Sequence, residues 1–222
     1  VEGLQQARHE WRERQHRIKE FGGRELPSRE SLKSILDDLC GILFPMRLGP
    51  SDLRQETEDY YIAYTLDRVL NELFSQVKLA LNYEAKSRVK QVPVSSNDHL
   101  LYEQQIALAK TIVQDFANTL PEIRRLLDAD VCAAYEGDPA AHSVDEVLLC
   151  YPGIFAIIYH RVAHEFYKQD LSLLARLIAE IAQQRGKADV SVAVLWELAN
   201  QTRDPRFAQR ATEIALRNRQ TG

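Results

Sequence analysis

Residues 26–45, LPSRESLKSILDDLCGILFP, decide the fold class. Their leucines and isoleucines recur at spacings of three and four, which places them on one face of a helix. Ser28 stands before the run as an N-cap, and Glu30 suits the dipole of the first turn. Pro45 and Gly49 end the pattern. The stretch therefore predicts an amphipathic helix with one buried face.

A helix is predicted on each side of this stretch. A charged helix spans about Leu4 to Glu20, and we expect it to lie as an arm on another subunit or on the domain surface. On the other side, Ser51 is predicted to cap a long third helix with Asp52 in its first turn. The apolar stripe of that helix continues to Leu81 and is wide enough to contact more than one neighbour.

The second half of the chain continues the helical pattern. A loop is predicted at 91–98, followed by a fourth helix capped by Asn97 or Asp98. Leu120-Pro121 divides this helix from a fifth, because proline disfavours helix at the residue before it and fits at a first helical position. A turn-rich connector at 135–143 and helices over 154–168 and 171–185 complete this part.

Composition supports an all-α protein. Hydrophobic residues make up 45% of the 222 positions, and nine glycines and eight prolines are few for a loop-rich or all-β fold. The net charge of −4 with interspersed signs argues against a nucleic-acid partner. No apolar run reaches the ~20 residues of a membrane span, and the start lacks a signal-peptide core. The chain begins with Val, so we expect that its start has been trimmed.

The three cysteines, Cys40, Cys132 and Cys150, are widely spaced and odd in number. They fit neither a disulfide framework nor a zinc site, which predicts a cytoplasmic protein. The sequence also has no phosphate-binding glycine loop, nucleophile elbow, HExxH or paired CxxC motif. We therefore assign no catalytic residue, no cofactor and no metal.

Three clusters have both a functional and a structural interpretation. His160 and His164 are four apart on one helix face and could share a metal ion, but a packed helix with polar tips is favoured because no third ligand is obvious. Asp138 before Pro139 is the residue type of a turn or helix cap. The acidic residues at 56, 58 and 59 are interpreted as a solvated helix start.

A family resemblance rests on the segment from Asp138 to His164. It contains Asp138-Pro139-Ala140, Leu148-Leu149, Gly153, Ala156 and Arg161-Val162-Ala163-His164. This spacing resembles the last part of the helical domain in serine O-acetyltransferases, which carry a DPA segment, an LL pair, a glycine and an R-[IV]-[GA]-H step. The stretch 26–45 is similar to the longer bacterial version of that domain, and the resemblance covers about residues 1–182.

The resemblance implies a multi-helix bundle that joins trimers or dimers into larger assemblies. It implies that Asp138 is the acidic residue of this domain that reaches the serine substrate. The family transfers an acetyl group from acetyl-CoA to serine, the entry to cysteine synthesis. Arg161 and His164 match the family pattern, and neither is assigned a chemical step.

The chain departs from the family after Ala182. Family members continue into hexapeptide repeats, a left-handed parallel β-helix that supplies the catalytic histidine and the acetyl-CoA groove. No such repeat follows in this chain. Without a base near the serine hydroxyl, acyl transfer has no machinery, so we expect no activity from the chain alone.

Residues 183–222 are predicted to form a second unit, a C-terminal α-hairpin that resembles one tetratricopeptide helix pair. One pair cannot bury both faces, so it should pack on the preceding helices, on a second subunit or on a partner. Its arginines are interpreted as a solvated face: Arg203, Arg206, Arg210, Arg217 and Arg219. The join at a shared helix suggests an engineered fusion, although a natural one would look the same.

Three hypotheses follow for function. The first is a catalytically silent helical module that forms a homo-oligomer. The second is a serine O-acetyltransferase subunit or regulatory fragment whose site another chain completes, with Asp138 as the remaining substrate contact. The third is an adaptor that captures a protein partner on the C-terminal hairpin.

Overall fold

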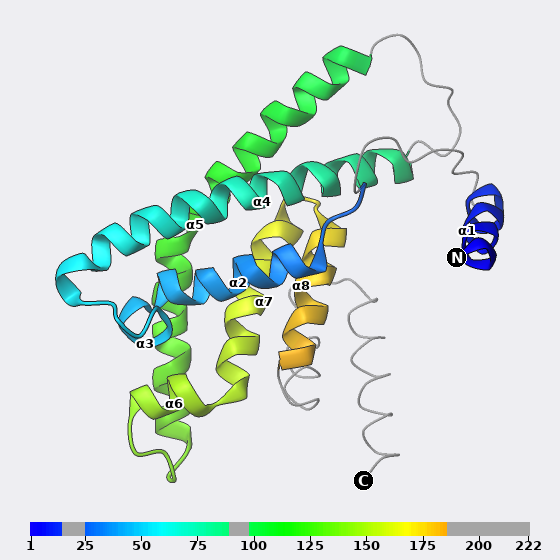
Figure 1. The fold of residues 1–222 in the computed structure, drawn as a ribbon. Coiled ribbons are helices and arrows are strands. Elements are labelled where there is room, and N and C mark those ends of the chain that lie inside the picture. Colours follow the sequence, from blue (N-terminus) through cyan, green and yellow to red (C-terminus); the bar gives the residue numbers. More distant parts are fainter. Residues whose placement is uncertain (15–24, 89–97, 186–222) are drawn as a thin grey trace.

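The described part of the chain is all-α. A computed structural model describes residues 1–14, 25–88 and 98–185, and no strand occurs among them. This confirms the predicted fold class. The elements are α1 (Glu2–Arg14), α2 (Arg29–Leu43), α3 (Pro45–Leu48), the 3-10 turn η1 (Gln55–Thr57), α4 (Glu58–Arg88), α5 (Asp98–Gly137), α6 (Val144–Cys150), α7 (Pro152–Lys168) and α8 (Ser172–Arg185) (Figure 1).

Helix α2 forms as its sequence predicts. Its N-cap is Ser28, whose hydroxyl accepts a hydrogen bond from the backbone N–H of Ser31 at 3.3 Å. The backbone N–H of Ser28 donates to the Gln76 side chain of α4 at 2.7 Å, which ties the start of α2 to its neighbour. The apolar face is fully buried: Leu32, Ile35, Leu36 and Leu39.

The predicted cap of the long third helix is wrong. Helix α4 begins at Glu58, and Ser51 lies in a turn in which the N–H of Leu53 donates to the Pro50 carbonyl. Pro, Ser and Asp in succession favour such a turn over a helix start, because the short polar side chains bond local backbone groups. A 3-10 turn then leads into the helix through Thr57, whose N–H donates to the Arg54 carbonyl.

The predicted break at Pro121 is also wrong, because α5 is one helix with this proline inside it. Leu120 and Ile123 are buried on either side of the proline, so packing holds the helix through it. Proline removes one backbone hydrogen bond and bends a helix rather than ending it when both flanks are packed. Figure 1 shows α5 changing direction part-way along its length.

The helices pack in two layers around one apolar core. Helices α2 and α4 lie side by side and cross over α5, α7 and α8, and contacts join α2 to α7 and α8 and α4 to α5 and α8 (Figure 1). At the centre the rings of Phe116 and Phe166 stack with centroids 4.8 Å apart. The fully buried Tyr159 donates from its hydroxyl to Asp37 of α2 at 3.0 Å.

The turn between α7 and α8 carries the non-glycine residue Asp170 at a φ of 60°. The N–H of Leu171 donates to the Phe166 carbonyl at 3.1 Å, and the N–H of Asp170 donates to the Tyr167 carbonyl. These two bonds form a Schellman motif. The carboxylate of Glu84, from α4, then accepts from the Ser172 hydroxyl at 3.0 Å and caps the start of α8.

The elements predicted at the two ends of the chain are described only in part. Helix α1 has no buried residue, and residues 15–20 of the longer helix predicted there lie outside the described residues. The predicted hairpin falls almost wholly at 186–222, also outside them, so the division at 182/183 stays a prediction. No single described helix is long and apolar enough to cross a membrane; α6 and α7 reach the threshold only as a pair bent by 76°.

Candidate functional site

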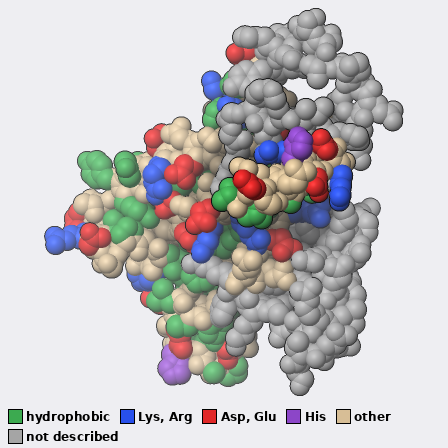
Figure 2. Space-filling view, turned by 45° about the vertical axis from the view of Figure 1, so that its right-hand side comes forward, with side chains coloured by type: hydrophobic (Ala, Val, Ile, Leu, Met, Phe, Trp, Pro, Cys, Tyr) green, Lys and Arg blue, Asp and Glu red, His purple; other side chains and the backbone are tan. Residues whose placement is uncertain are grey.

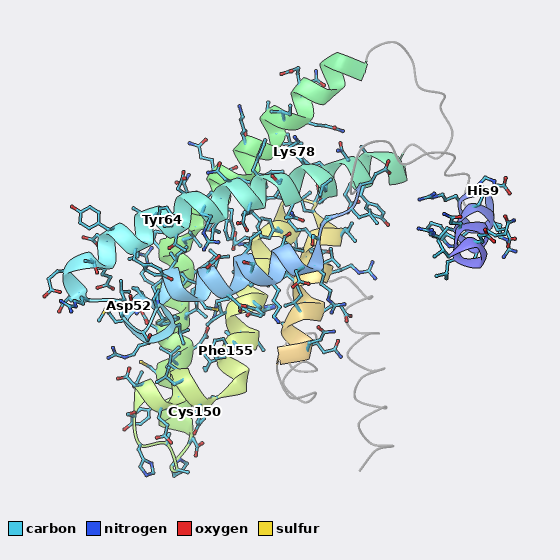
Figure 3. All side chains as sticks on the ribbon, viewed as in Figure 1. His9, Asp52, Tyr64, Lys78, Cys150 and Phe155 are labelled. Carbon is cyan, nitrogen blue, oxygen red and sulfur yellow. The ribbon has the colours of Figure 1, made fainter. Side chains whose placement is uncertain are left out.

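Asp138 lies in the connector between α5 and α6. In Figure 3 this connector is at the same end of the molecule as the labelled Cys150. One carboxylate oxygen, Oδ1, accepts from the backbone N–H of Ala140 at 2.9 Å. The other, Oδ2, accepts from the hydroxyl of Tyr151, the residue before α7. Both oxygens of this half-buried carboxylate are therefore held by neutral donors.

These two donors favour the ionised carboxylate. The Tyr151 hydroxyl, followed by the Ala140 N–H, lowers the pKa of Asp138 below its ordinary value. In return, the hydrogen bond to Asp138 raises the pKa of Tyr151 to about 12. At neutral pH the pair is thus a carboxylate and a neutral phenol.

Asp138 differs from the aspartates around it in having no cationic partner among the described residues. Asp145 pairs with Arg47 at 2.7 Å, and Asp128 pairs with Arg124 at 3.0 Å. Asp130 also has an arginine partner, described below. The charge of Asp138 is oriented but not neutralised within this part of the chain.

The start of α6 fixes the shape of the connector. The hydroxyl of Ser143 caps the helix by accepting from the N–H of Glu146 at 3.0 Å. The carboxylate of Glu146 reaches back to accept from the N–H of His142 at 2.8 Å. These reciprocal bonds resemble a capping box, and they hold the residues that follow Asp138.

Arg161, the family-pattern residue on α7, is used for structure. Its guanidinium donates to both carboxylate oxygens of Asp130 on α5, at 2.7 and 2.8 Å. This bidentate pair joins the two helices that flank the connector, about two turns from Asp138 along α5. Arg161 therefore holds together the two helices beside the site and is not part of the surface that a ligand would meet.

His160 and His164 do not form a metal centre with any other described residue. No group of three His, Cys, Asp or Glu side chains that could hold a metal occurs among the described residues. The two rings stack with centroids 6.3 Å apart, and His160 is buried. Burial, then the charge of Lys168, lowers the pKa of His164, so the neutral ring is favoured.

A separate hollow of about 380 Å³ lies between α3, α5 and α6. Glu58, the one residue of the predicted acidic cluster that reaches it, shares its lining with Arg47 and Asp145. Arg124 closes another side, with its guanidinium carbon 4.1 Å from the centre of the Phe44 ring. Asp138 does not line this hollow, and its arginines already have acidic partners.

Sequence reasoning found Asp138 but missed the residue that holds it. Tyr151 is 13 positions away and precedes a Pro-Gly pair, where a tyrosine carries no motif signal. Asp130 was missed in the same way, because it is one acid among several on a long helix. Only the packing of α7 on α5 brings each partner into reach.

Comparison with known proteins leads to the same family as the sequence motifs. Over 167 residues the chain is 45% identical to the plasmid serine acetyltransferase of Synechococcus elongatus, a match that covers 74% of this chain and 50% of that relative. It is also 44% identical over 59 residues to the serine acetyltransferase of Bacillus subtilis, or 27% of each protein. About three quarters of the chain is homologous to the amino-terminal region of serine acetyltransferases.

Solved structures of serine acetyltransferases support the fold. Isoform 3 from Entamoeba histolytica, in complex with cysteine, superposes with a TM-score of 0.52 at 22% identity over 75% of this chain and 48% of its own. Serine acetyltransferase 1 from the same organism, in complex with L-cysteine, gives 0.50 at 25% identity over 71% and 47%. The chain spans about half the length of these serine acetyltransferases, and no protein-family model matches it.

Proposed function

We propose that the chain is the helical amino-terminal module of a serine acetyltransferase-like protein, which holds copies together and has no acetyl transfer of its own. The observation that carries this proposal is the 45% identity over 167 residues, confined to half of the relative. The matched helices enclose a contiguous core, as an independently folding module requires.

Exposed aromatic side chains support a role in assembly. Tyr60 and Tyr64 lie one turn apart on α4 and are 80% and 74% exposed. Figure 3 shows Tyr64 pointing away from the other helices, and Figure 2 shows hydrophobic side chains among charges of both signs on the surface. Helix α1 buries nothing within the chain, and a 13-residue helix is marginal in water without a surface to pack on.

Light scattering coupled to size exclusion tests the assembly. It is applied to the whole chain and to a version that ends at Ala182. A discrete multimer from both places assembly in the homologous helices, and replacing Tyr60 and Tyr64 by serine should then weaken it. Monomers from both versions would contradict the proposal, and a multimer lost on truncation would move assembly to residues 183–222. Steady turnover of serine and acetyl-CoA by the pure chain would contradict its catalytic silence.

A second candidate function is a subunit whose serine site is completed by another chain. The observation that favours it is Asp138, an ionised carboxylate without a cationic partner in the described part of the chain. Such a group suits the ammonium of an amino acid better than a divalent metal, since no further ligands accompany it among these residues. Calorimetry should detect L-serine binding that Asp138→Ala abolishes, and no heat at millimolar serine would count against it.

The tail adds proposals that rest on sequence alone. Residues 183–222 would offer a hairpin to a protein partner, and their join to the preceding helices would be engineered. The pattern of cysteines in the sequence adds the proposal that the protein is cytoplasmic. A pull-down that depends on residues 187–222 would support the partner, and equal capture by the truncated chain would contradict it.

A further inference from the structure

Two parts of the chain that are separate in sequence meet at Asp138. The Ala140 N–H belongs to the same turn as Asp138, whereas the Tyr151 hydroxyl comes from beyond α6. The turn donor holds Oδ1 alone, so without Tyr151 the second oxygen has no protein donor among the described residues. Tyr151 is therefore the contact that sets the orientation of the whole carboxylate.

Tyr151 is itself firmly placed. It ends α6, where its N–H donates to the Val147 carbonyl at 3.1 Å, and it begins α7, where its carbonyl accepts from the N–H of Ile154 at 3.0 Å. Farther along α7, the bidentate pair of Arg161 with Asp130 fixes this helix against α5. The helix that follows Tyr151 and the helix that leads to Asp138 are thus joined independently of the Tyr151–Asp138 bond.

The electrostatic surroundings suit an added cation. Among the described residues, Glu146 and Cys150 act on the Tyr151 hydroxyl besides Asp138, and each can only be negative or neutral. His142, the imidazole of the same connector, pairs with Glu146. Tyr151 is neutral at physiological pH, so it orients Asp138 without cancelling its charge. Each carboxylate oxygen accepts one protein donor and keeps a further lone pair for a ligand.

We propose that Tyr151 is a positioning residue, whose hydroxyl sets the direction in which Asp138 presents its carboxylate to the ammonium group of an amino-acid ligand. This inference rests on the second candidate function above. The ligand joins the Tyr151–Asp138 pair and does not displace the phenol. Removing the hydroxyl leaves the charge of Asp138 in place but lets the carboxylate turn.

The test compares four forms of the whole chain: unaltered, Tyr151→Phe, Asp138→Asn and Tyr159→Phe. The last is a matched control, because it removes a bond from a tyrosine hydroxyl to a different aspartate, Asp37 of α2. Carboxyl NMR follows the pKa of Asp138 in the forms that retain it, and calorimetry follows the binding of L-serine. N-acetyl-L-serine, which lacks the ammonium, is the ligand control.

In Tyr151→Phe we expect the pKa of Asp138 to rise toward its ordinary value and serine affinity to fall about three- to tenfold, a factor that corresponds to about one ordinary net hydrogen bond. Tyr159→Phe should change neither, and N-acetyl-L-serine should not bind. Serine binding that is lost in Asp138→Asn but unchanged in Tyr151→Phe would overturn the positioning role and leave the candidate function standing. Failure of the unaltered chain to bind serine would overturn both.

Discussion

The two ends of α7 are built on different principles. Its carboxyl-terminal half lies in the core, where Phe166 is fully buried against Phe116. Its amino-terminal end emerges at the connector, where Tyr151 packs at the edge of the core and its hydroxyl donates to Asp138. Many small apolar contacts together stabilise the first end, whereas at the second end one donor, the Tyr151 hydroxyl, sets the orientation of the Asp138 carboxylate. A lost side chain should therefore cost stability at the core end and orientation at the connector end.

The largest effect is expected from Phe166→Ala. Removing a fully buried aromatic side chain leaves a cavity and should lower the free energy of unfolding by about 3–5 kcal/mol. Urea denaturation measures the loss, with Leu108→Ala as the half-exposed apolar control on α5, which should cost about 1 kcal/mol or less. Similar losses from both variants would show that the core end of α7 is not where stability is concentrated.

A smaller effect is expected from Arg161→Met, between the two ends. This change leaves Asp130 without its bidentate partner, and because both side chains are a quarter exposed, water can take up part of the lost bonding. We expect a loss of about 1–2 kcal/mol by urea denaturation. Arg125→Met, which removes the exposed pair with Glu122 on α5, should cost less than about 0.5 kcal/mol. Equal costs would place Arg161 among ordinary surface residues.

The buried helix faces of the core could be predicted from the sequence, because the spacing of apolar residues indicates which side of a helix is buried. The spacing of three and four in α2 predicted the buried leucines and isoleucines, and Ser28 predicted the helix start. The errors arose where tertiary structure outweighed local preference. Packing on both sides carried α5 through Pro121, and a local turn delayed α4 beyond Ser51.

The contacts at the connector end of α7 could be predicted from the sequence only in part. Asp138 could be named because its motif resembles a family, but no pattern links it to a tyrosine 13 residues away. That contact depends on how α6 turns the chain back, which is a property of the packed helices rather than of the local sequence. The same holds for Asp130 and Arg161, 31 residues apart.

The pH dependence of the Tyr151–Asp138 pair gives a third prediction. The pKa of Asp138 is lowered in the folded chain, so its stabilisation is present above the ordinary value of 3.8 and is lost as pH falls through the folded value. The pKa of Tyr151 is raised from 10.0 to about 12, so its stabilisation is present below 10.0 and is lost as pH rises through about 12. Between these limits the bond contributes fully.

The free energy of unfolding of Tyr151→Phe, compared with the unaltered chain from acid to alkaline pH, measures this dependence. The difference should be constant from about pH 5 to 9 and should shrink toward both extremes. Tyr64→Phe, on the exposed face of α4, should show no such profile. A difference that persists unchanged at low pH would mean that Asp138 is not the partner whose ionisation matters.

The smallest effect is expected at Asp170, where the core end of α7 turns into α8. Its φ of 60° is a conformation that costs most residues energy and costs glycine little, and the Asp170 side chain is exposed, so glycine should lose little packing. Asp170→Gly should therefore raise the free energy of unfolding by about 0.5 kcal/mol, while Asp170→Val should lower it by about 1–2 kcal/mol. Urea denaturation of both variants decides the matter. A glycine variant less stable than the unaltered chain would mean that Asp170 contributes through its carboxylate. The core end of α7 would then also depend on a single polar side chain, as the connector end does.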